Sequence, residues 1–295
     1  MTDKEIKALI SLLDDQDQEV QEHIQDKLLT LGTEVIPLLE DAWGGSFDAI
    51  LQERIEEVIH KIQFEVLVDE VNDWAANNSS DLLEGAILIA KYQYPDLSID
   101  KIEKELERIK RDAWLEMNDN YTALEKVRVL NKVFFGMHNF NGNTVNFHAP
   151  QNSYINTVLE TRKGNPLLLC IIYAVIANQL KMPVYGVNLP EHFVLAYKNE
   201  MEEIKPKLPT EAKDILFYIN PFSKGTVFDK KEIDSFLKKL KIEPKEFFYQ
   251  PCTNVDIIKR LLRNLIYSYD KLGHTEKSEE LTHMLKQLSK TVPGN

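Results

Sequence analysis

The chain has 295 residues, enough for two structural units or for one core with helical additions. Only 12 prolines and 11 glycines are present, so the composition favours long helices over a sandwich or barrel with many turns. Thirty-five basic against 47 acidic residues give a net charge of −12, which works against binding to a nucleic-acid backbone. We therefore expect a helix-rich protein that does not bind nucleic acid.

The number of cysteines and the length of the hydrophobic runs indicate in which cellular compartment the protein is expected. The two cysteines, Cys170 and Cys252, are too few for a disulfide framework. The first residues show no secretory signal pattern, and the longest apolar run, 166–177, is shorter than the roughly 20 residues that cross a bilayer. We expect a soluble, cytoplasmic protein that does not insert into a membrane.

Residues 1–64 repeat a helical pattern of apolar positions. The positions are Ile6, Ile10, Leu13, Val20, Ile24, Leu28, Val35, Leu38, Leu39, Ile50, Ile55, Val58 and Ile62. Residues 8–43, ALISLLDDQDQEVQEHIQDKLLTLGTEVIPLLEDAW, resemble a HEAT-type repeat, a pair of antiparallel helices with an acidic turn. One or two such repeats are too few for a free-standing solenoid, so we predict an interaction or packing module that docks on the remainder.

Three further segments follow. Residues 65–130 continue the helical pattern, and we expect them to pack on a core at 131–245. In the tail, 250–295, apolar positions at helical spacing lie on both sides of a break at Gly273 and predict two antiparallel helices.

The core combines one buried helix with a small sheet. Gly164-Asn165-Pro166 supplies a cap and a first-turn proline, and residues 167–180 are apolar almost all round, which predicts a central helix. Segments rich in β-branched and aromatic residues predict three strands, at 184–189, 192–198 and 215–219. This order indicates a helix-rich α+β fold with an antiparallel sheet.

Three polar residues of the core are candidates for a catalytic device. Cys170 lies on the buried helix, His192 opens the second strand, and Asn220 follows the third. A thiol needs a base to become a thiolate, and the histidine needs a third group to orient it. The alternative interpretation makes Cys170 a small core residue, His192 a hydrogen-bonded strand-end residue and Asn220 a turn cap.

At these residues the chain resembles the SirB-type branch of the transglutaminase-like superfamily. The segments that carry the resemblance are NFNGNTVNFHAPQNSYINTVLETRKGNPLLLCIIYAVIANQLKMPVYGVNLPEHFVLAY and FYINPFSKG. The resemblance covers about 82–240 and extends to the tail, which resembles the tetratricopeptide-like hairpin that often closes this branch. It implies a papain-like α+β core in which a helix packs on an antiparallel sheet.

Two departures from the family pattern bear on activity. In transglutaminase-like enzymes, a proline starts the strand that follows the nucleophile, and here that proline is Pro183. Cys170 lies closer to Pro183 in the sequence than the family's nucleophile lies to its proline. The family's spacing, counted back from Pro183, gives Pro166 or Leu167. Neither side chain is a nucleophile. The second departure is Asn220, where the family usually has aspartate, although papain-like proteases also use asparagine as the orienting group.

An asparagine-rich segment before the central helix is a candidate rim of a cleft. The rim residues we predict are His138, Asn139, Asn141, Asn152 and Tyr154. No acidic or thiol partner is spaced with the histidines of this segment, so we predict no metal site, and the absence of a glycine-rich phosphate loop predicts no nucleotide cofactor.

Two functions remain open at this point. The first is a binding or regulatory protein that keeps the papain-like cleft without efficient catalysis and contacts a protein or peptide partner. The second is a cysteine-dependent amide hydrolase or transamidase that acts on a protein or peptide through Cys170, His192 and Asn220. The displaced nucleophile position favours the first.

Overall fold

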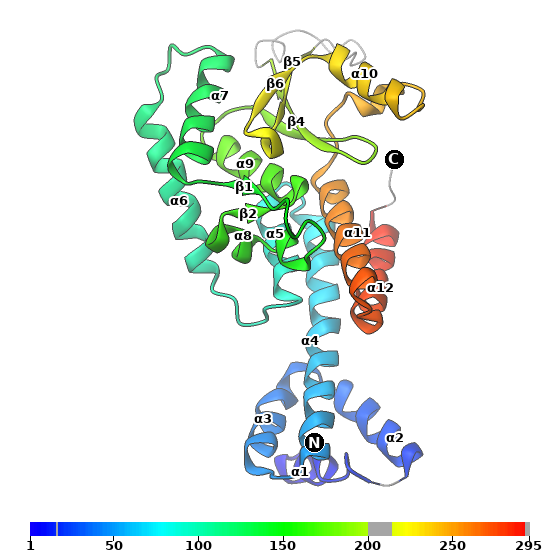
Figure 1. The fold of residues 1–295 in the computed structure, drawn as a ribbon. Coiled ribbons are helices and arrows are strands. Elements are labelled where there is room, and N and C mark those ends of the chain that lie inside the picture. The colour runs from blue at the N-terminus through cyan, green and yellow to red at the C-terminus, as the bar shows by residue number, and fades with distance from the viewer. Residues whose placement is uncertain (16, 200–213, 293–295) are drawn as a thin grey trace. The chain divides into compact units, whose positions relative to one another are not determined.

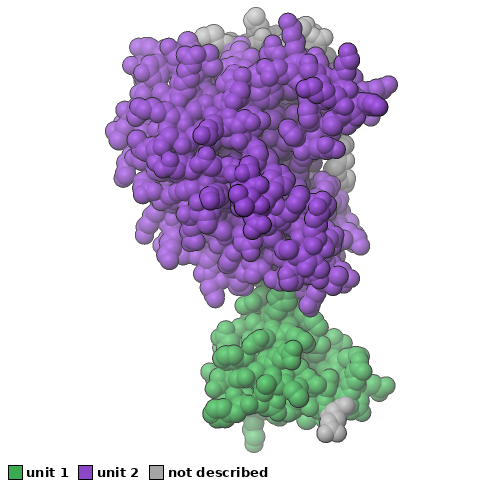
Figure 2. All heavy atoms as spheres, in the orientation of Figure 1, with its two compact units in different colours: residues 1–70 green, residues 71–295 purple. Residues whose placement is uncertain are grey.

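The computed structural model describes residues 1–15, 17–199 and 214–292, and the chain divides into two compact units (Figures 1 and 2). The units are Met1–Glu70 and Val71–Asn295. Helix α4, Ala49–Asn77, contains the division, and the predicted boundary at 64/65 lies in the same helix. Among the described residues, no helix is both long and apolar enough to span a bilayer.

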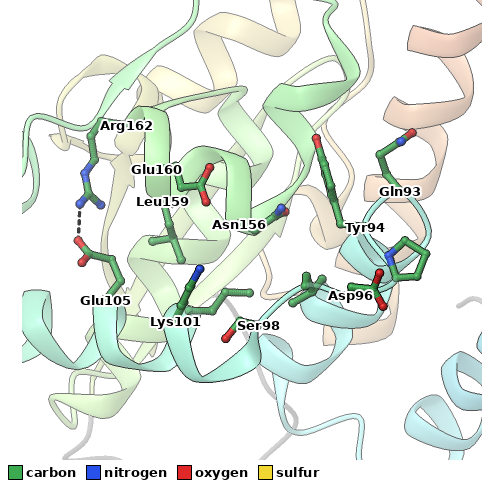
Figure 3. A pocket seen from close by; sticks show the side chains of 13 residues that line it. Gln93, Tyr94, Asp96, Ser98, Lys101, Glu105, Asn156, Leu159, Glu160 and Arg162 are labelled. Atoms are coloured by element: carbon green, nitrogen blue, oxygen red, sulfur yellow. Dashed lines mark hydrogen bonds and ion pairs between the residues drawn. The ribbon is translucent and has the colours of Figure 1, made fainter.

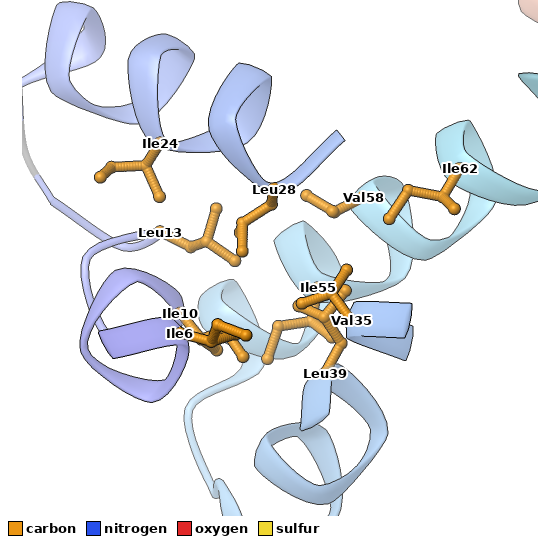
Figure 4. Close-up of a cluster of buried hydrophobic side chains, with 10 residues drawn as sticks. All are labelled: Ile6, Ile10, Leu13, Ile24, Leu28, Val35, Leu39, Ile55, Val58 and Ile62. Carbon is orange, nitrogen blue, oxygen red and sulfur yellow. The ribbon is translucent and has the colours of Figure 1, made fainter. Parts of the chain in front are cut away.

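The first unit is a small helical module. It contains α1 (Asp3–Ile10), α2 (Gln18–Leu29), a 3-10 turn (Gly32–Val35), α3 (Ile36–Gly45) and the first part of α4. Thr2 and Glu5 form a capping box at the start of α1, and Asp17 caps α2. Ten buried residues form its core (Figure 4): Ile6, Ile10, Leu13, Ile24, Leu28, Val35, Leu39, Ile55, Val58 and Ile62. All ten are positions of the predicted helical period, which is confirmed there, whereas Ile50 is 57% exposed.

Helices precede the sheet in the second unit. They are α5 (Leu82–Lys91), α6 (Ile99–Glu116), α7 (Ala123–Asn131), a π-helical segment (Lys132–Met137), a 3-10 turn (Pro150–Ser153) and α8 (Ile155–Thr161). Two short strands not predicted from the sequence, β1 (Asn141–Gly142) and β2 (Lys163–Gly164), pair in parallel. Each has only two residues, too few to show an alternating pattern.

The central helix, α9, runs from Pro166 to Gln179, and every residue from 167 to 177 is buried. Its position and burial confirm the predicted central helix. The side chain of Asn165 accepts a hydrogen bond from the Leu168 amide at 2.8 Å, and Pro166 occupies the first turn, where no amide hydrogen is needed. The helix packs on strands of the sheet and on α5 and α6 (Figure 1).

A four-stranded antiparallel sheet confirms the predicted α+β fold. Its strands are β3 (Val184–Asn188), β4 (Phe193–Lys198), β5 (Ile215–Asn220) and β6 (Thr226–Phe228), in the order β3-β4-β5-β6. The first three match the predicted strands, and β6 was not predicted. Helix α10 (Lys230–Lys239) follows, and Ile233 and Leu237 of α10 are buried in a cluster with Val194 and Tyr218 of the sheet.

Two long helices end the described chain. After a 3-10 turn (Glu246–Phe248), α11 (Asn254–Leu272) and α12 (Thr275–Thr291) pack along each other (Figure 1). Gly273 joins them with a φ of 78°, a left-handed conformation that glycine adopts without strain. The helical pair predicted for the tail is confirmed.

Candidate functional site

A cavity of about 190 Å³ lies at the start of α9. We call it the α9 cleft. Asn165, Pro166 and Leu167 contribute its helical side, and the other lining residues are Phe147, His148, Glu191, Phe193, Arg260, Asn264, Tyr267 and Ser268. The residues come from the loop before α8, the turn before β4, and α11. Pro166 and Leu167, where the resemblance leads us to expect the family's nucleophile, line the cleft with side chains that cannot attack a carbonyl.

Asn152 organises one wall of the α9 cleft. It is 3% exposed, and its Nδ2 donates to the main-chain oxygens of Asn146 (2.6 Å) and Phe147 (3.1 Å). Its Oδ1 accepts from Nδ2 of Asn143 at 2.9 Å. This predicted rim residue thus lies beneath the loop that carries Phe147 and His148 rather than facing the cavity itself.

The loop and the cap of α9 are connected through neighbours of Asn152. Nδ2 of Asn165 donates to Oγ of Ser153 at 2.7 Å, and the Asn165 amide donates to the main-chain oxygen of Asn152 at 3.2 Å. The His148 ring lies edge-on to that of Tyr267, with centroids 5.4 Å apart. One continuous set of contacts therefore joins the helix cap, the loop and α11 around the cavity.

Cys170 lies one turn deeper in α9 and is not among the described residues that line the α9 cleft. Its side chain is 0% exposed, and Sγ donates to the main-chain oxygen of Phe193 at 3.6 Å. Burial raises the pKa of this thiol well above its usual range, and the charge of Arg260 lowers it by less. A thiol in this environment stays protonated near neutral pH.

His192 lies just before β4 and is exposed. Its Nδ1–H donates to the main-chain oxygen of Glu191 at 3.0 Å, and its ring is 4.7 Å from that of Phe236 on α10. Its two neighbours, Glu191 and Phe193, line the α9 cleft. The left-handed φ of Glu191, 57°, turns the chain at this point.

Asn220 ends β5 and starts a 3-10 turn, Pro221–Ser223. Its Oδ1 accepts from the amide of Ser223 at 3.3 Å, which is the turn-capping role. In the part of the chain that the structure describes, no hydrogen bond joins Cys170, His192 and Asn220 to one another.

The other predicted rim residues make contacts inside the second unit. His138 is 7% exposed, and its Nε2 lies 2.9 Å from Oδ2 of Asp112. Tyr154 is buried, with its hydroxyl 2.9 Å from that of Tyr269. Asn139 has a left-handed φ of 57°, and Asn141 belongs to β1.

Sequence reasoning missed the contribution of α11. Arg260, Asn264, Tyr267 and Ser268 recur at helical spacing and form a polar stripe beside the apolar one. Arg260 donates to the side-chain oxygen of Asn188 and, at 2.7 Å, to the main-chain oxygen of Leu189. The spacing was visible in the sequence, but which face of the helix meets α9 depends on the packing. No group of three or more potential metal ligands occurs within 1–15, 17–199 and 214–292.

A buried helix on an antiparallel sheet, with a cleft at the helix start, is the arrangement of a transglutaminase-like protein. The transglutaminase-like superfamily matches residues 100–263, more than half of the sequence. The chain belongs to this superfamily.

Several relatives cover most of the chain. A UPF0162 protein of Xylella fastidiosa (strain 9a5c) is 26% identical over 218 residues, which cover 72% of each chain. UPF0162 protein YchA of Escherichia coli K12 is 24% identical over 219 residues, 73% of this chain and 77% of YchA. Human F-box only protein 21 is 24% identical over 228 residues, 69% of this chain but only 34% of the human protein. No solved structure matches.

Proposed function

We propose that this protein binds a protein or peptide partner in the α9 cleft and does not catalyse acyl transfer. The observation that carries the proposal is the first turn of α9, where Pro166 and Leu167 line the cavity; these are the positions at which the resemblance leads us to expect the family's nucleophile. The buried Cys170 supports it further, because a protonated thiol with no access to the cavity cannot attack a substrate.

The α9 cleft, at about 190 Å³, is too small to enclose a whole ligand, and its lining suits a short stretch of a bound peptide. Aromatic rings of Phe147, Phe193 and Tyr267 offer apolar contact, while Asn264 and Ser268 can exchange hydrogen bonds with a peptide backbone. We further propose that the chain is of the SirB-type branch, that it is cytoplasmic, and that its HEAT-like residues, 1–64, and its tetratricopeptide-like hairpin, 250–295, add contacts to the partner.

The cysteine-dependent alternative, amide hydrolysis or transamidation through Cys170, His192 and Asn220, requires an opening of the core. The thiol would have to leave its hydrogen bond with Phe193 and reach the His192 ring, which lies against Phe236. A working thiol and histidine are within hydrogen-bond reach of each other, or slightly beyond it before substrate binds.

Selection of displayed random peptides on the full-length protein tests the binding proposal. The selected peptides should lose at least about tenfold in affinity for Asn264→Leu, which replaces a polar lining side chain by an apolar one of similar shape and removes its amide. They should bind normally to Arg263→Ala, because Arg263 is the exposed neighbour of Asn264 and does not line the cavity. Equal binding to wild type and to Asn264→Leu would contradict the proposal.

A further inference from the structure

A second and larger cavity, of about 690 Å³, lies between α6, α8 and the segment that joins α5 to α6 (Figure 3). We call it the α6–α8 cavity. It shares no lining residue with the α9 cleft. Its volume is in the range of cavities that hold small organic ligands, which are about 300 to 1,000 Å³. Nothing in the proposed function uses it.

Two lining residues carry buried polar atoms that lack a partner. Oδ1 of Asn156 and Nη1 of Arg162 are both buried, and neither has a hydrogen-bond partner among the residues that the structure describes. Such atoms are rare in folded proteins because burial removes their bonds to water. One atom is an acceptor and the other a donor, so a ligand that satisfies both must offer an N–H or O–H and an oxygen.

Two contacts fix the position of the Arg162 guanidinium group. Its Nη2 forms an ion pair with Glu105 of α6 (Figure 3), and its guanidinium lies 4.9 Å from the centroid of the Phe140 ring. Glu105 also pairs with Arg108, so its charge is shared between two arginines. Nη1 of Arg162 has no hydrogen-bond partner among the described residues, and a planar guanidinium binds a carboxylate with two parallel hydrogen bonds or with one.

The remaining charges of the α6–α8 cavity have both signs. Lys101 adds a positive charge, while Asp96 and Glu160 add negative charges (Figure 3). None of these three forms an ion pair with another residue in the described ranges. A phosphate or another polyanion would face these unpaired carboxylates, and a purely apolar ligand would leave every charge unused. Apolar surface is present as well, from Ile102 and Leu159.

We propose that the α6–α8 cavity binds a short peptide with free ends. Its carboxylate accepts hydrogen bonds from Arg162 and Lys101, and its ammonium group pairs with Asp96 or Glu160. A backbone N–H donates to Oδ1 of Asn156. This ligand satisfies the unpartnered donor, the unpartnered acceptor and the unpaired charges together, and its side chains contact the apolar wall. The proposal does not depend on the function proposed for the α9 cleft.

Titration with the tripeptide alanyl-alanyl-alanine, followed by NMR of the ¹⁵N-labelled full-length protein, tests the proposal. We expect saturable shifts of the Asn156 side-chain amide with a Kd of about 0.1 to 1 mM. Acetylation of the peptide amine should weaken binding about tenfold, because it removes the charge that pairs with Asp96 or Glu160. Amidation of the carboxyl group should weaken binding by more than about tenfold, because it removes the charge that both Arg162 and Lys101 bind. Free alanine should bind more weakly than the tripeptide, because it has no backbone amide for Asn156.

Two lysine variants test whether the tripeptide binds in the α6–α8 cavity. Lys101→Ala should weaken tripeptide binding about tenfold, whereas Lys104→Ala, on the same helix but outside the cavity, should not change it. Both lysines are exposed, so neither variant threatens folding. The proposal is overturned by an absence of shifts up to about 10 mM peptide, by binding that both lysine variants leave unchanged, or by equal affinity for alanine and the tripeptide. Loss of binding in Asn264→Leu alone would place the peptide in the α9 cleft and would also overturn it.

Discussion

The thiol of Cys170 donates its hydrogen bond to the main-chain oxygen of Phe193, 3.6 Å away, and not to the histidine that precedes Phe193 in the chain. The contact joins α9 to the first residue of β4. The His192 ring packs instead on Phe236 of α10. A transglutaminase-like fold is therefore compatible with a cysteine that serves only the core.

Slow modification of Cys170 is the first prediction. A neutral thiol reagent should label the native Cys252→Ala protein slowly, because burial raises the pKa of the Cys170 thiol and blocks access. Unfolding in denaturant should make labelling fast. The Cys252→Ala background is needed because Cys252 is half-buried and its pKa, raised to about 12 mainly by burial, makes it a second slow site. Fast labelling near neutral pH that is lost in His192→Ala would support the enzyme alternative instead.

Substitution of Cys170 by serine should destabilise the protein by about 1 to 3 kcal/mol. The acceptor, the main-chain oxygen of Phe193, is 3.6 Å from Sγ, which is beyond the usual length of a hydroxyl hydrogen bond. The serine Oγ would lie no closer to this acceptor, because a C–O bond is shorter than a C–S bond. Cys170→Ala should cost less, since it buries no polar group. Urea unfolding of the three proteins measures the difference. Negligible losses in both variants would show that water reaches the site.

Asn152→Ala should loosen the loop beside the α9 cleft. The substitution removes the bonds that Asn152 makes to Asn143, Asn146 and Phe147, and it should destabilise the protein by about 2 to 4 kcal/mol. Hydrogen exchange of the amides at 143–149 should become faster. Gln151→Ala is the matched control, because Gln151 is an exposed neighbour on the same 3-10 turn. Unchanged exchange in Asn152→Ala would mean that the ring contacts alone hold the loop.

The free energy of unfolding should decrease between pH 7 and pH 5, because His138 takes up a proton more readily in the unfolded chain. Burial lowers the pKa of this histidine, and the hydrogen bond to Asp112 offsets part of the effect. Because the folded pKa is below the unfolded value, the unfolded chain binds the proton more tightly, and acid favours unfolding by at most about 1.4 kcal/mol per pH unit. Urea unfolding across this pH range should show a smaller slope for His138→Gln. An equal slope for the wild type and His138→Gln would contradict the assignment to His138.

Removal of residues 1–64 should lower the thermal midpoint or the solubility of the remaining chain. A chain that starts at Glu65 begins within α4 and loses the helical turns before it, which extend and support the remaining part of that helix. Calorimetry of the full-length and truncated proteins provides the comparison. An unchanged thermal midpoint would identify the N-terminal helices as an independent module.

The local sequence pattern by itself predicted most of the helices and strands. The helical period of 1–64, the cap and proline at Asn165-Pro166, and the β-branched strands each depend on neighbours in sequence, and all are present, although Ile50 of the predicted period is exposed. The two-residue strands β1 and β2 were not predictable, because their pairing joins segments far apart in the chain.

The arrangement of the candidate site could not be predicted from the sequence, because it depends on the tertiary structure. Cys170, His192 and Asn220 are in the expected order along the chain, but order does not set the direction in which a side chain points. Packing of β4 on α9 gives Cys170 the Phe193 carbonyl as its partner, and packing of α10 places Phe236 against His192. The polar stripe of α11 lines the α9 cleft only because the fold brings this distant helix beside Pro166 and Leu167. Long-range packing, which no local periodicity encodes, decided which residues face the cavity.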